Sequence, residues 1–254
     1  MKITGNTILI TGGASGIGRG LAERFHGLGN HVVIAGRRKH ALDETVAANR
    51  GMTSLTLDIA DPANIHDFAA EVGALYPLLN VLINNAGIMR AEKLRSQPTD
   101  LAEAEAMVAT NLLGPMRLTA ELLPLLQMQP HSTIMNVSSG LAFVPIAPTP
   151  TYCATKAAIH SYTQSLRYQL QASNIEVLEL IPPYVATDLM GGASDPRAMP
   201  LKKFIGEVME LLERQPTPAE ICVENVKRLR FAAESGNYDS VFHGLNEAMN
   251  NLVE

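Results

Sequence analysis

The chain has 254 residues, of which 46% are hydrophobic and 18% are charged, and its mean hydropathy is +0.07. This amount of apolar material excludes a disordered chain and is sufficient for a substantial core. Lysine and arginine number 20 and aspartate and glutamate 25, which gives a formal net charge of −5. There is no long basic run, so we expect no nucleic-acid partner.

The two cysteines, Cys153 and Cys222, form no Cys-x-x-Cys pair, and the seven histidines have no ligand spacing. We therefore predict two free thiols and no metal site. The start of the chain lacks the long apolar run of a signal peptide, and no stretch reaches the roughly 18 apolar residues of a membrane helix. These features predict a cytoplasmic protein with no membrane partner.

Short β-rich runs alternate with amphipathic stretches along most of the chain. Several of the runs are continuously apolar, which is typical of parallel strands covered by helices on both faces. The predicted strands are Thr7–Ile10, His31–Ala35, Ser54–Leu57, Val81–Asn84, Thr133–Val137, Glu176–Ile181 and Tyr238–Phe242.

The stretches between these runs have helical start signals and apolar faces. Asp61 before Pro62 is typical of an N-cap followed by the first helical residue. A capping box at Thr217–Glu220 predicts a further helix, with Cys222, Val226, Leu229 and Ala233 on one face. Other helices are predicted from Ile17 to Leu28 and over Leu101–Gln127, Tyr152–Ala172 and Leu201–Leu212.

This alternation predicts an α/β fold, a doubly wound parallel sheet of about seven strands with helices on both faces. No repeat, low-complexity tract or linker divides the chain, so we predict a single domain over residues 1–254. The loosest stretch, Met190–Pro200, leads into an apolar helix. We interpret residues 188–215 as an insertion that forms a lid over the substrate.

A glycine-rich turn, Thr11–Gly18, follows the first predicted strand and opens the first helix. Such glycines allow a tight turn and close approach to a pyrophosphate, while the helix N-terminus supplies free N–H donors. No Gly-Lys-Ser/Thr follows, which excludes a P-loop. A ligand-free turn is the alternative. The candidate cofactor-binding residues of this turn are Gly12, Ser15, Gly16, Ile17 and Gly18.

The end of the second predicted strand discriminates between the two nicotinamide dinucleotides. A carboxylate there would bind a free ribose 2′-hydroxyl, but this chain has Gly36 followed by Arg37 and Arg38. Two arginines can pair with a 2′-phosphate through charge-assisted hydrogen bonds, although taken alone they could be a solvated corner. We therefore predict NADP(H) rather than NAD(H).

Tyr152 and Lys156 are four residues apart at the start of a predicted helix, so their side chains share one face. A free tyrosine titrates near ~10, and a neighbouring ammonium lowers that pKa toward the working range of an acid or base. A surface helix pair is the alternative reading of this spacing. Ser138 and Ser139 end the fifth predicted strand just upstream, at the sheet edge where ligands bind.

These motifs together resemble the short-chain dehydrogenase/reductase family, in its compact branch of about this length and with its Rossmann-like fold. The resemblance covers nearly the whole chain. The motifs in family order are Thr11–Gly18, Asp58, Asn84-Asn85-Ala86-Gly87, Asn111, Ser139, Tyr152 and Lys156, with Ser139 thirteen residues before Tyr152.

The resemblance implies a catalytic set of Asn111, Ser139, Tyr152 and Lys156. Tyr152 would be the general acid/base, and Ser139 would orient the carbonyl oxygen. Lys156 would lower the pKa of Tyr152 and hold the nicotinamide ribose, and Asn111 would position a water. The further cofactor contacts implied by the resemblance are Asp58, Asn85, Ala86, Gly87, Pro182 and Thr187.

The chain departs from the family pattern in two places. Pro182-Pro183 replaces the usual Pro-Gly after the sixth strand, which we interpret as the mark of a subgroup. The carboxyl end, from Phe242 onward, lacks the glycine-rich tail of many relatives. The two longest predicted helices still resemble the pair through which family members dimerise, so we expect a homodimer or homotetramer.

The sequence thus predicts an NADP(H)-dependent oxidoreductase that interconverts a carbonyl compound and its alcohol. The alternative is a non-catalytic dinucleotide-binding sensor or scaffold with the same fold. An acyl-transfer role for Ser139 is not supported, because no Gly-x-Ser-x-Gly surrounds it. Apolar residues in Ile88–Leu94, Gly140–Thr151 and Met190–Leu212 favour a mainly apolar small-molecule substrate.

Overall fold

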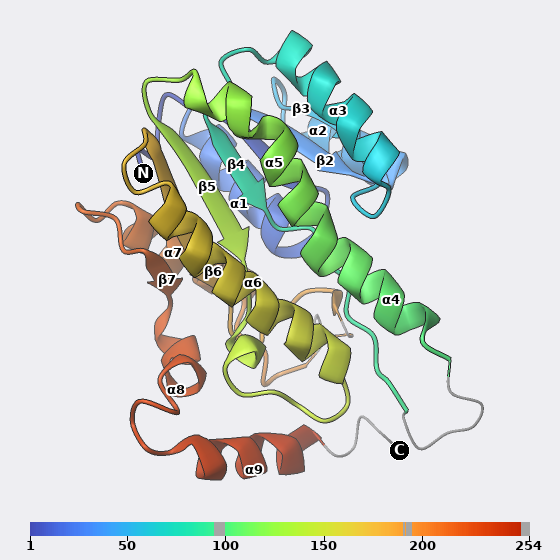
Figure 1. Ribbon diagram of the computed structural model, residues 1–254, viewed down its shortest axis with the longest axis vertical. Coiled ribbons are helices and arrows are strands. Elements are labelled where there is room, and N and C mark those ends of the chain that lie inside the picture. Colours follow the sequence, from blue (N-terminus) through green and yellow to red (C-terminus); the bar gives the residue numbers. More distant parts are fainter. Residues whose placement is uncertain (94–99, 190, 192–194, 250–254) are drawn as a thin grey trace.

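The computed structural model describes residues 1–93, 100–189, 191 and 195–249. Within these ranges, seven parallel strands form one sheet in the order β3-β2-β1-β4-β5-β6-β7 (Figure 1). Six of the predicted strands are confirmed to within one residue at each end. The strands are β1 (Thr7–Thr11), β2 (His31–Gly36), β3 (Thr53–Thr56), β4 (Val81–Asn84), β5 (Ser132–Val137), β6 (Ile175–Ile181) and β7 (Glu220–Cys222).

Helices cover both faces of this sheet, as the continuous apolar strands predict. Leu21, Leu42 and Phe204 of α1, α2 and α7 belong to the core of one face. Phe68 and Leu118 of α3 and α5 belong to the core of the other face, together with residues of α6. The helices are α1 (Gly16–Gly27), α2 (Lys39–Ala48), α3 (Pro62–Leu75), α4 (Ala102–Val108), α5 (Gly114–Gln127), α6 (Pro150–Gln169), α7 (Leu201–Leu212), α8 (Lys227–Arg230) and α9 (Tyr238–Met249).

The central strands supply side chains to both cores in strict alternation. Ile8 and Ile10 of β1 pack into the α1 face, while Leu9 between them packs into the α5 face. All three are fully buried. Burying one such side chain contributes about 1.5–3 kcal/mol. The doubly wound arrangement therefore follows from the apolar run of each central strand.

The predicted strand over Tyr238–Phe242 is wrong, because these residues begin helix α9. Val241 and Leu245 lie four residues apart on one helical face and pack against Val144. This spacing of four residues is helical, whereas a strand would alternate at every second residue. The residues that favour strands within Tyr238–Phe242 led to the strand prediction, although the helical spacing extends beyond them.

The seventh strand lies instead at β7, where Glu220, Ile221 and Cys222 pair with Glu179, Leu180 and Ile181 of β6. The helix predicted from the Thr217–Glu220 capping box is therefore wrong. Ile221 is fully buried at the sheet edge, and its burial outweighs a local capping signal. In place of the predicted helix, a 3₁₀ turn at Glu224–Val226 leads into the short helix α8.

The predicted helix over Leu101–Gln127 is interrupted by a π-helical segment, Ala109–Leu113, between α4 and α5. Pro115 has no amide hydrogen, so it cannot donate to the carbonyl of Asn111 four residues earlier. A wider turn at this point is the physical consequence. Single π turns inside α-helices are frequent at functional sites.

The strands all point toward the end of the molecule across which α9 lies (Figure 1). β1 and β4 are neighbours at the centre, where the order of strands along the sheet reverses direction. Ligands of open α/β sheets bind in the crevice outside this reversal point. None of the described helices combines the length and hydropathy needed to cross a bilayer.

Candidate active site

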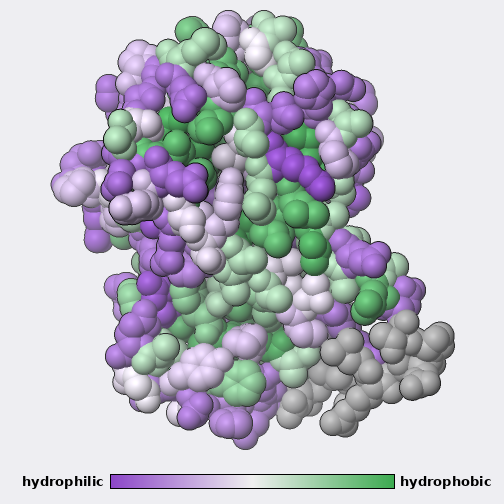
Figure 2. Space-filling model, viewed as in Figure 1, coloured by the Kyte–Doolittle hydropathy of each residue, from purple (hydrophilic) through white to green (hydrophobic). Residues whose placement is uncertain are grey.

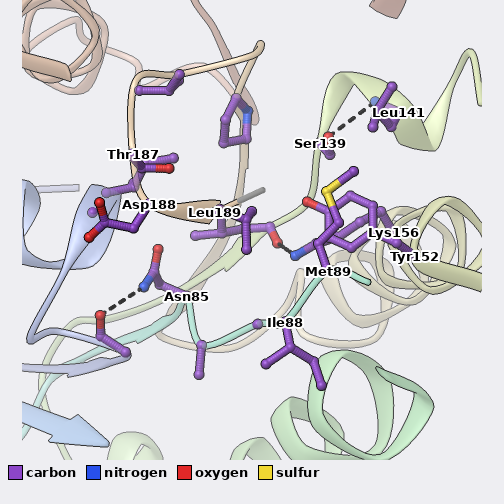
Figure 3. A pocket seen from close by; sticks show the side chains of 18 of the residues that line it. Asn85, Ile88, Met89, Ser139, Leu141, Tyr152, Lys156, Thr187, Asp188 and Leu189 are labelled. Atoms are coloured by element: carbon purple, nitrogen blue, oxygen red, sulfur yellow. Dashed lines mark hydrogen bonds between the residues drawn. The ribbon is translucent and has the colours of Figure 1, made fainter. Parts of the chain in front are cut away.

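A cavity of about 890 Å³ opens at the carboxyl ends of the strands. Its walls come from the turns after β1, β4 and β5, the segment after β6, and helices α6 and α9. In Figure 3, Ser139, Tyr152 and Lys156 lie on one side of this cavity, and Thr187 and Asp188 lie on the opposite side. Residues far apart in the sequence therefore meet at one site.

The glycine-rich turn forms one end of the cavity, as predicted. Gly12 and Gly16 have positive φ values of 67° and 53°, which favour glycine. Ser15 is the N-cap of α1, but its side chain caps no amide, so the first N–H groups of the helix have no side-chain acceptor. Because Ser15, Gly16 and Ile17 line the cavity, this end fits an anionic group such as a pyrophosphate.

Asn85, just after β4, clamps this turn. Its side-chain amide donates to the carbonyl of Thr11 at 2.9 Å, and its backbone N–H donates to Thr11 Oγ1 at 3.0 Å. Gly18 makes the contact possible, because a Cβ there would lie 2.4 Å from Asn85 Nδ2. Asn85, Ala86 and Gly87 line the cavity, whereas Gly18 packs behind its wall.

The positive rim lies at the end of β2. Arg37 and Arg38 are exposed and line the cavity, and Arg38 Nη2 donates to Ser15 Oγ at 3.0 Å. Asp58 is not part of the described wall. Its carboxylate instead accepts from the backbone N–H of Ala60 at 3.0 Å and organises its own turn.

The predicted acid/base pair lies at the other end of the cavity. Tyr152 is only 7% exposed and Lys156 only 4%, and the Lys156 ammonium lies 5.7 Å from the centre of the Tyr152 ring. Lys156 Nζ donates to the carbonyl of Val137, at the end of β5, at 2.8 Å. Ser139 Oγ accepts from the backbone N–H of Leu141 at 3.1 Å (Figure 3), and the Ser139 hydroxyl lies close enough to Tyr152 to affect its pKa.

Burial displaces the pKa values of this pair in opposite directions. It raises the pKa of Tyr152 to about 12, against the opposing effect of the Ser139 hydrogen bond. It lowers the pKa of Lys156 to about 8, against the attraction of the Glu179 carboxylate. Both displacements arise because burial disfavours a charged form. Between about pH 8 and 12 both groups are therefore in their neutral forms, and the lowering of the Tyr152 pKa that the sequence predicts from Lys156 is not found.

Asn111 lies in the π-helical segment and fixes the loop after β4. Its Oδ1 accepts from the N–H of Ile88, and its Nδ2 donates to the carbonyl of Ile88, both at 2.8 Å. Asn111 Nδ2 also donates to Thr155 Oγ1 on α6 at 3.3 Å. Asn111 is almost fully buried beside the described wall, which includes its neighbour Thr110.

Two further predicted residues, Pro182 and Thr187, line the cavity from the segment after β6. A Cβ on Gly16 would lie 3.4 Å from Thr187, so this segment reaches across to the glycine-rich turn. Of the segments predicted to select the substrate, residue 94 and residues 190 and 192–194 lie outside the described residues. The part after them, α7, packs closely on α1, where Gly20 faces Ile205.

The carboxyl end of the chain contributes wall residues that the sequence did not predict. Leu245 and Met249 of α9 line the cavity, and both pack in a cluster with Tyr152 and Ile146. Their spacing of four residues was the available signal, but it was hidden by the wrong strand prediction. Arg197, which pairs with Asp195 at 2.7 Å, also lines the cavity.

Comparisons with known proteins agree with this geometry. The family model described as short chain dehydrogenase matches residues 6–198. An uncharacterized oxidoreductase, DltE, of Bacillus subtilis (strain 168) is 38% identical over 256 residues, which cover 98% of this chain and 100% of the relative.

Solved structures are similar over most of the chain as well. A short-chain dehydrogenase from Sphingobium yanoikuyae in complex with NADPH has a TM-score of 0.78 and 25% identity, covering 94% of this chain and 95% of that one. A 3-ketoacyl-(acyl-carrier-protein) reductase from Brucella melitensis complexed with NADH has a TM-score of 0.76 and 25% identity, covering 85% of this chain and 94% of that one. From its motifs, its fold and these relatives, the chain belongs to the short-chain dehydrogenase/reductase family of oxidoreductases, which act on CH–OH and C=O groups.

Proposed function

We propose that the protein is an NADP(H)-dependent oxidoreductase that interconverts a carbonyl compound and its alcohol, with Tyr152 as the general acid/base. The observation that carries this proposal is the buried Tyr152–Lys156 pair at the cavity wall, with Lys156 hydrogen-bonded to the carbonyl of Val137 and Ser139 beside Tyr152. A sensor or scaffold would have no use for a tyrosine, a lysine and a serine converging at a cavity wall. Such a constellation is what general acid–base catalysis requires.

Each residue of the set has a distinct role in this proposal. Tyr152 donates its phenolic proton to the carbonyl oxygen during reduction and takes it back during oxidation. Ser139 holds that oxygen in place. Lys156 is charged below about pH 8 and lies 5.7 Å from the centre of the Tyr152 ring, so it favours the phenolate as the proton leaves, while Asn111 fixes the Ile88 loop. A bound nicotinamide dinucleotide would supply or accept the hydride.

The residues at the glycine-rich end fit a dinucleotide with a 2′-phosphate. The uncapped amides of α1 suit the pyrophosphate, and Arg37 and Arg38 suit the additional phosphate through charge-assisted hydrogen bonds. The Sphingobium relative is in complex with NADPH and the Brucella relative with NADH, so relatives use both kinds of cofactor. The absence of a carboxylate at Gly36 favours NADP(H) for this chain.

The substrate proposed for the remaining space is a mainly apolar carbonyl compound or alcohol. Met89, Leu141, Ile146, Leu245 and Met249 surround Tyr152 with apolar surface. An apolar wall with a few polar groups is the usual design of a small-molecule site. Of the predicted insertion around residues 188–215, helix α7 is packed into the core, so the part proposed to close over the substrate is the segment before it, with Asp188 and Leu189 at the cavity wall.

A homodimer or homotetramer is part of the proposal. On the face drawn in Figure 2, hydrophobic patches lie over the region where α4, α5 and α6 pack together. Leu113 of the π-helical segment and Tyr168 of α6 are exposed, Tyr168 by 73%. A monomer mass by light scattering at micromolar concentration would contradict this assembly. Cytoplasmic location stays a prediction, tested by fractionation of cells that express the protein.

The experiment that tests the function measures NADPH consumption against a panel of aldehydes, ketones, quinones and diketones. Turnover that is lost in Tyr152→Phe, while NADPH still binds by fluorescence titration, would support the reductase. Tight NADPH binding without turnover on any member of the panel would favour the sensor instead.

A further inference from the structure

A buried carboxylate lies directly behind the proposed catalytic residues. Glu179 of β6 has no solvent exposure. Its Oε1 accepts from Ser138 Oγ at 2.5 Å, and its Oε2 lies 2.8 Å from Nδ1 of His160, whose side chain is 18% exposed. A buried carboxylate is costly unless it is paired and hydrogen-bonded, and here both conditions are met. A residue that is so costly to bury needs a reason beyond packing.

His160 extends the catalytic row of α6. Tyr152, Lys156 and His160 lie four residues apart, so all three project from the same side of the helix. Lys156 donates to the carbonyl of Val137, and the next residue along the chain, Ser138, donates to Glu179. The Val137–Ser138 peptide, at the end of β5, together with the Ser138 side chain therefore connects the ammonium of Lys156 with the carboxylate of Glu179, and Ser139 follows immediately.

Other charged groups surround Glu179 from the elements packed against β6. Glu220 and Cys222 lie on β7, and Arg230 on α8 binds both oxygens of Glu220 at 2.7 and 3.1 Å. Because Arg230 already neutralises Glu220, the local charge that faces α6 is that of Glu179. His160, Glu179 and Glu220 bring ligand atoms within 4.8 Å of one another, but these groups already have partners in the protein, Glu220 in Arg230 and Glu179 in His160 and Ser138.

We propose that Glu179, held by His160 and Ser138, is a positioning residue that keeps Lys156 in its charged form and anchors the end of β5 that presents Ser139. This role rests on the proposed function, because it acts through Lys156 and Ser139. Lys156 is buried with only a backbone carbonyl as its hydrogen-bond acceptor in the described structure. Glu179 supplies the negative charge that a buried ammonium otherwise lacks.

Glu179→Gln removes the negative charge of this side chain while keeping its packing. The amide has nearly the same shape, its oxygen can accept from Ser138, and its nitrogen can donate to a neutral His160. The matched control is Glu176→Gln on the same strand, because Glu176 pairs with the amino terminus at the opposite end of β6. His160→Gln is a second control, since it retains the Glu179 carboxylate and its amide can still donate to it.

The test measures the pKa of Lys156 directly, by trace acetylation at a series of pH values with mass-spectrometric quantitation of its peptide. A small reagent can reach Lys156, because the residue lines the cavity. We expect Glu179→Gln to lower the pKa of Lys156 by about 1 unit or more, and Glu176→Gln and His160→Gln to leave it in place. The alkaline limb of the NADPH-dependent activity should move to lower pH by the same amount.

An unchanged Lys156 pKa in folded Glu179→Gln would overturn the proposal, as would a lowered pKa with no movement of the alkaline limb. If Glu179→Gln does not fold, Ser138→Ala tests the anchor, with an expected fall in kcat and an unchanged Lys156 pKa. Wild-type kcat in that variant would refute the anchor. The acetylation result does not depend on turnover, so it remains readable even if Tyr152→Phe shows that the proposed function is wrong.

Discussion

Gly18→Ala is the perturbation that tests the glycine-rich turn most sharply. The added Cβ would lie 2.4 Å from Asn85 Nδ2 and 2.4 Å from the carbonyl oxygen of Gly12. Both distances are far shorter than a van der Waals contact. The Gly12 oxygen belongs to the backbone, so it cannot move aside as a flexible side chain could. The turn and the Asn85 clamp must therefore move apart.

The magnitude follows from three contributions. Overpacking of a close contact costs about 1–3 kcal/mol. Breaking the hydrogen bond from Asn85 to Thr11 adds about 1 kcal/mol, and the better helix propensity of alanine returns about 0.5–1 kcal/mol. We expect a net loss of about 2 kcal/mol in the free energy of unfolding. For a domain of this size that corresponds to a fall in Tm of roughly 4–8 °C.

Thermal unfolding and NADPH titration measure the two consequences. Gly27→Ala is the matched control, because Gly27 lies in the same helix and a Cβ there meets nothing within 4 Å. The control should keep its Tm and its affinity for NADPH, whereas Gly18→Ala should have a lower Tm and bind NADPH more weakly. Equal behaviour of the two variants would refute the close-approach reasoning.

Two further predictions concern the charges of the site. Arg37→Ala with Arg38→Ala should weaken NADPH binding about tenfold or more and leave NADH binding little changed; equal losses for both cofactors would contradict the NADP(H) assignment. Burial lowers the pKa of Lys156 from 10.5 to about 8, so burying the charged ammonium costs about 3 kcal/mol of folding free energy. Lys156→Met removes this cost. That cost is full below pH 8 and fades as pH rises toward 10.5, so wild-type protein should gain stability relative to Lys156→Met between pH 7 and 9.5 in urea unfolding. A constant difference would contradict the lowered pKa.

Most of the fold could be predicted because its signals are local and agree with one another. The continuous apolar runs of β1, β2 and β4 and the amphipathic helices between them are features of neighbouring residues. The seventh strand could not be predicted in this way. Its three residues are a strand only because β6 offers an unpaired edge, and a local capping box argued for a helix.

The candidate site divides in the same manner. Gly12, Ser139, Tyr152 and Lys156 stand in recognisable motifs, and the structure brings them to one cavity. The wall residues of α9 and the buried Glu179 belong to no recognisable sequence motif. Both depend on tertiary packing, since Glu179 reaches Ser138 and His160 only when β5, β6 and α6 are assembled.

The most direct test of the account is the rate of NADPH-dependent reduction in Tyr152→Phe, compared with Tyr168→Phe on the same helix. Tyr168 is exposed, so its variant controls for the loss of a hydroxyl on α6. Removing a general acid typically lowers the rate by about 10²–10⁴-fold. We predict a loss of this size in Tyr152→Phe, with NADPH binding retained, and full activity in Tyr168→Phe. Undiminished turnover in Tyr152→Phe would contradict the proposed mechanism.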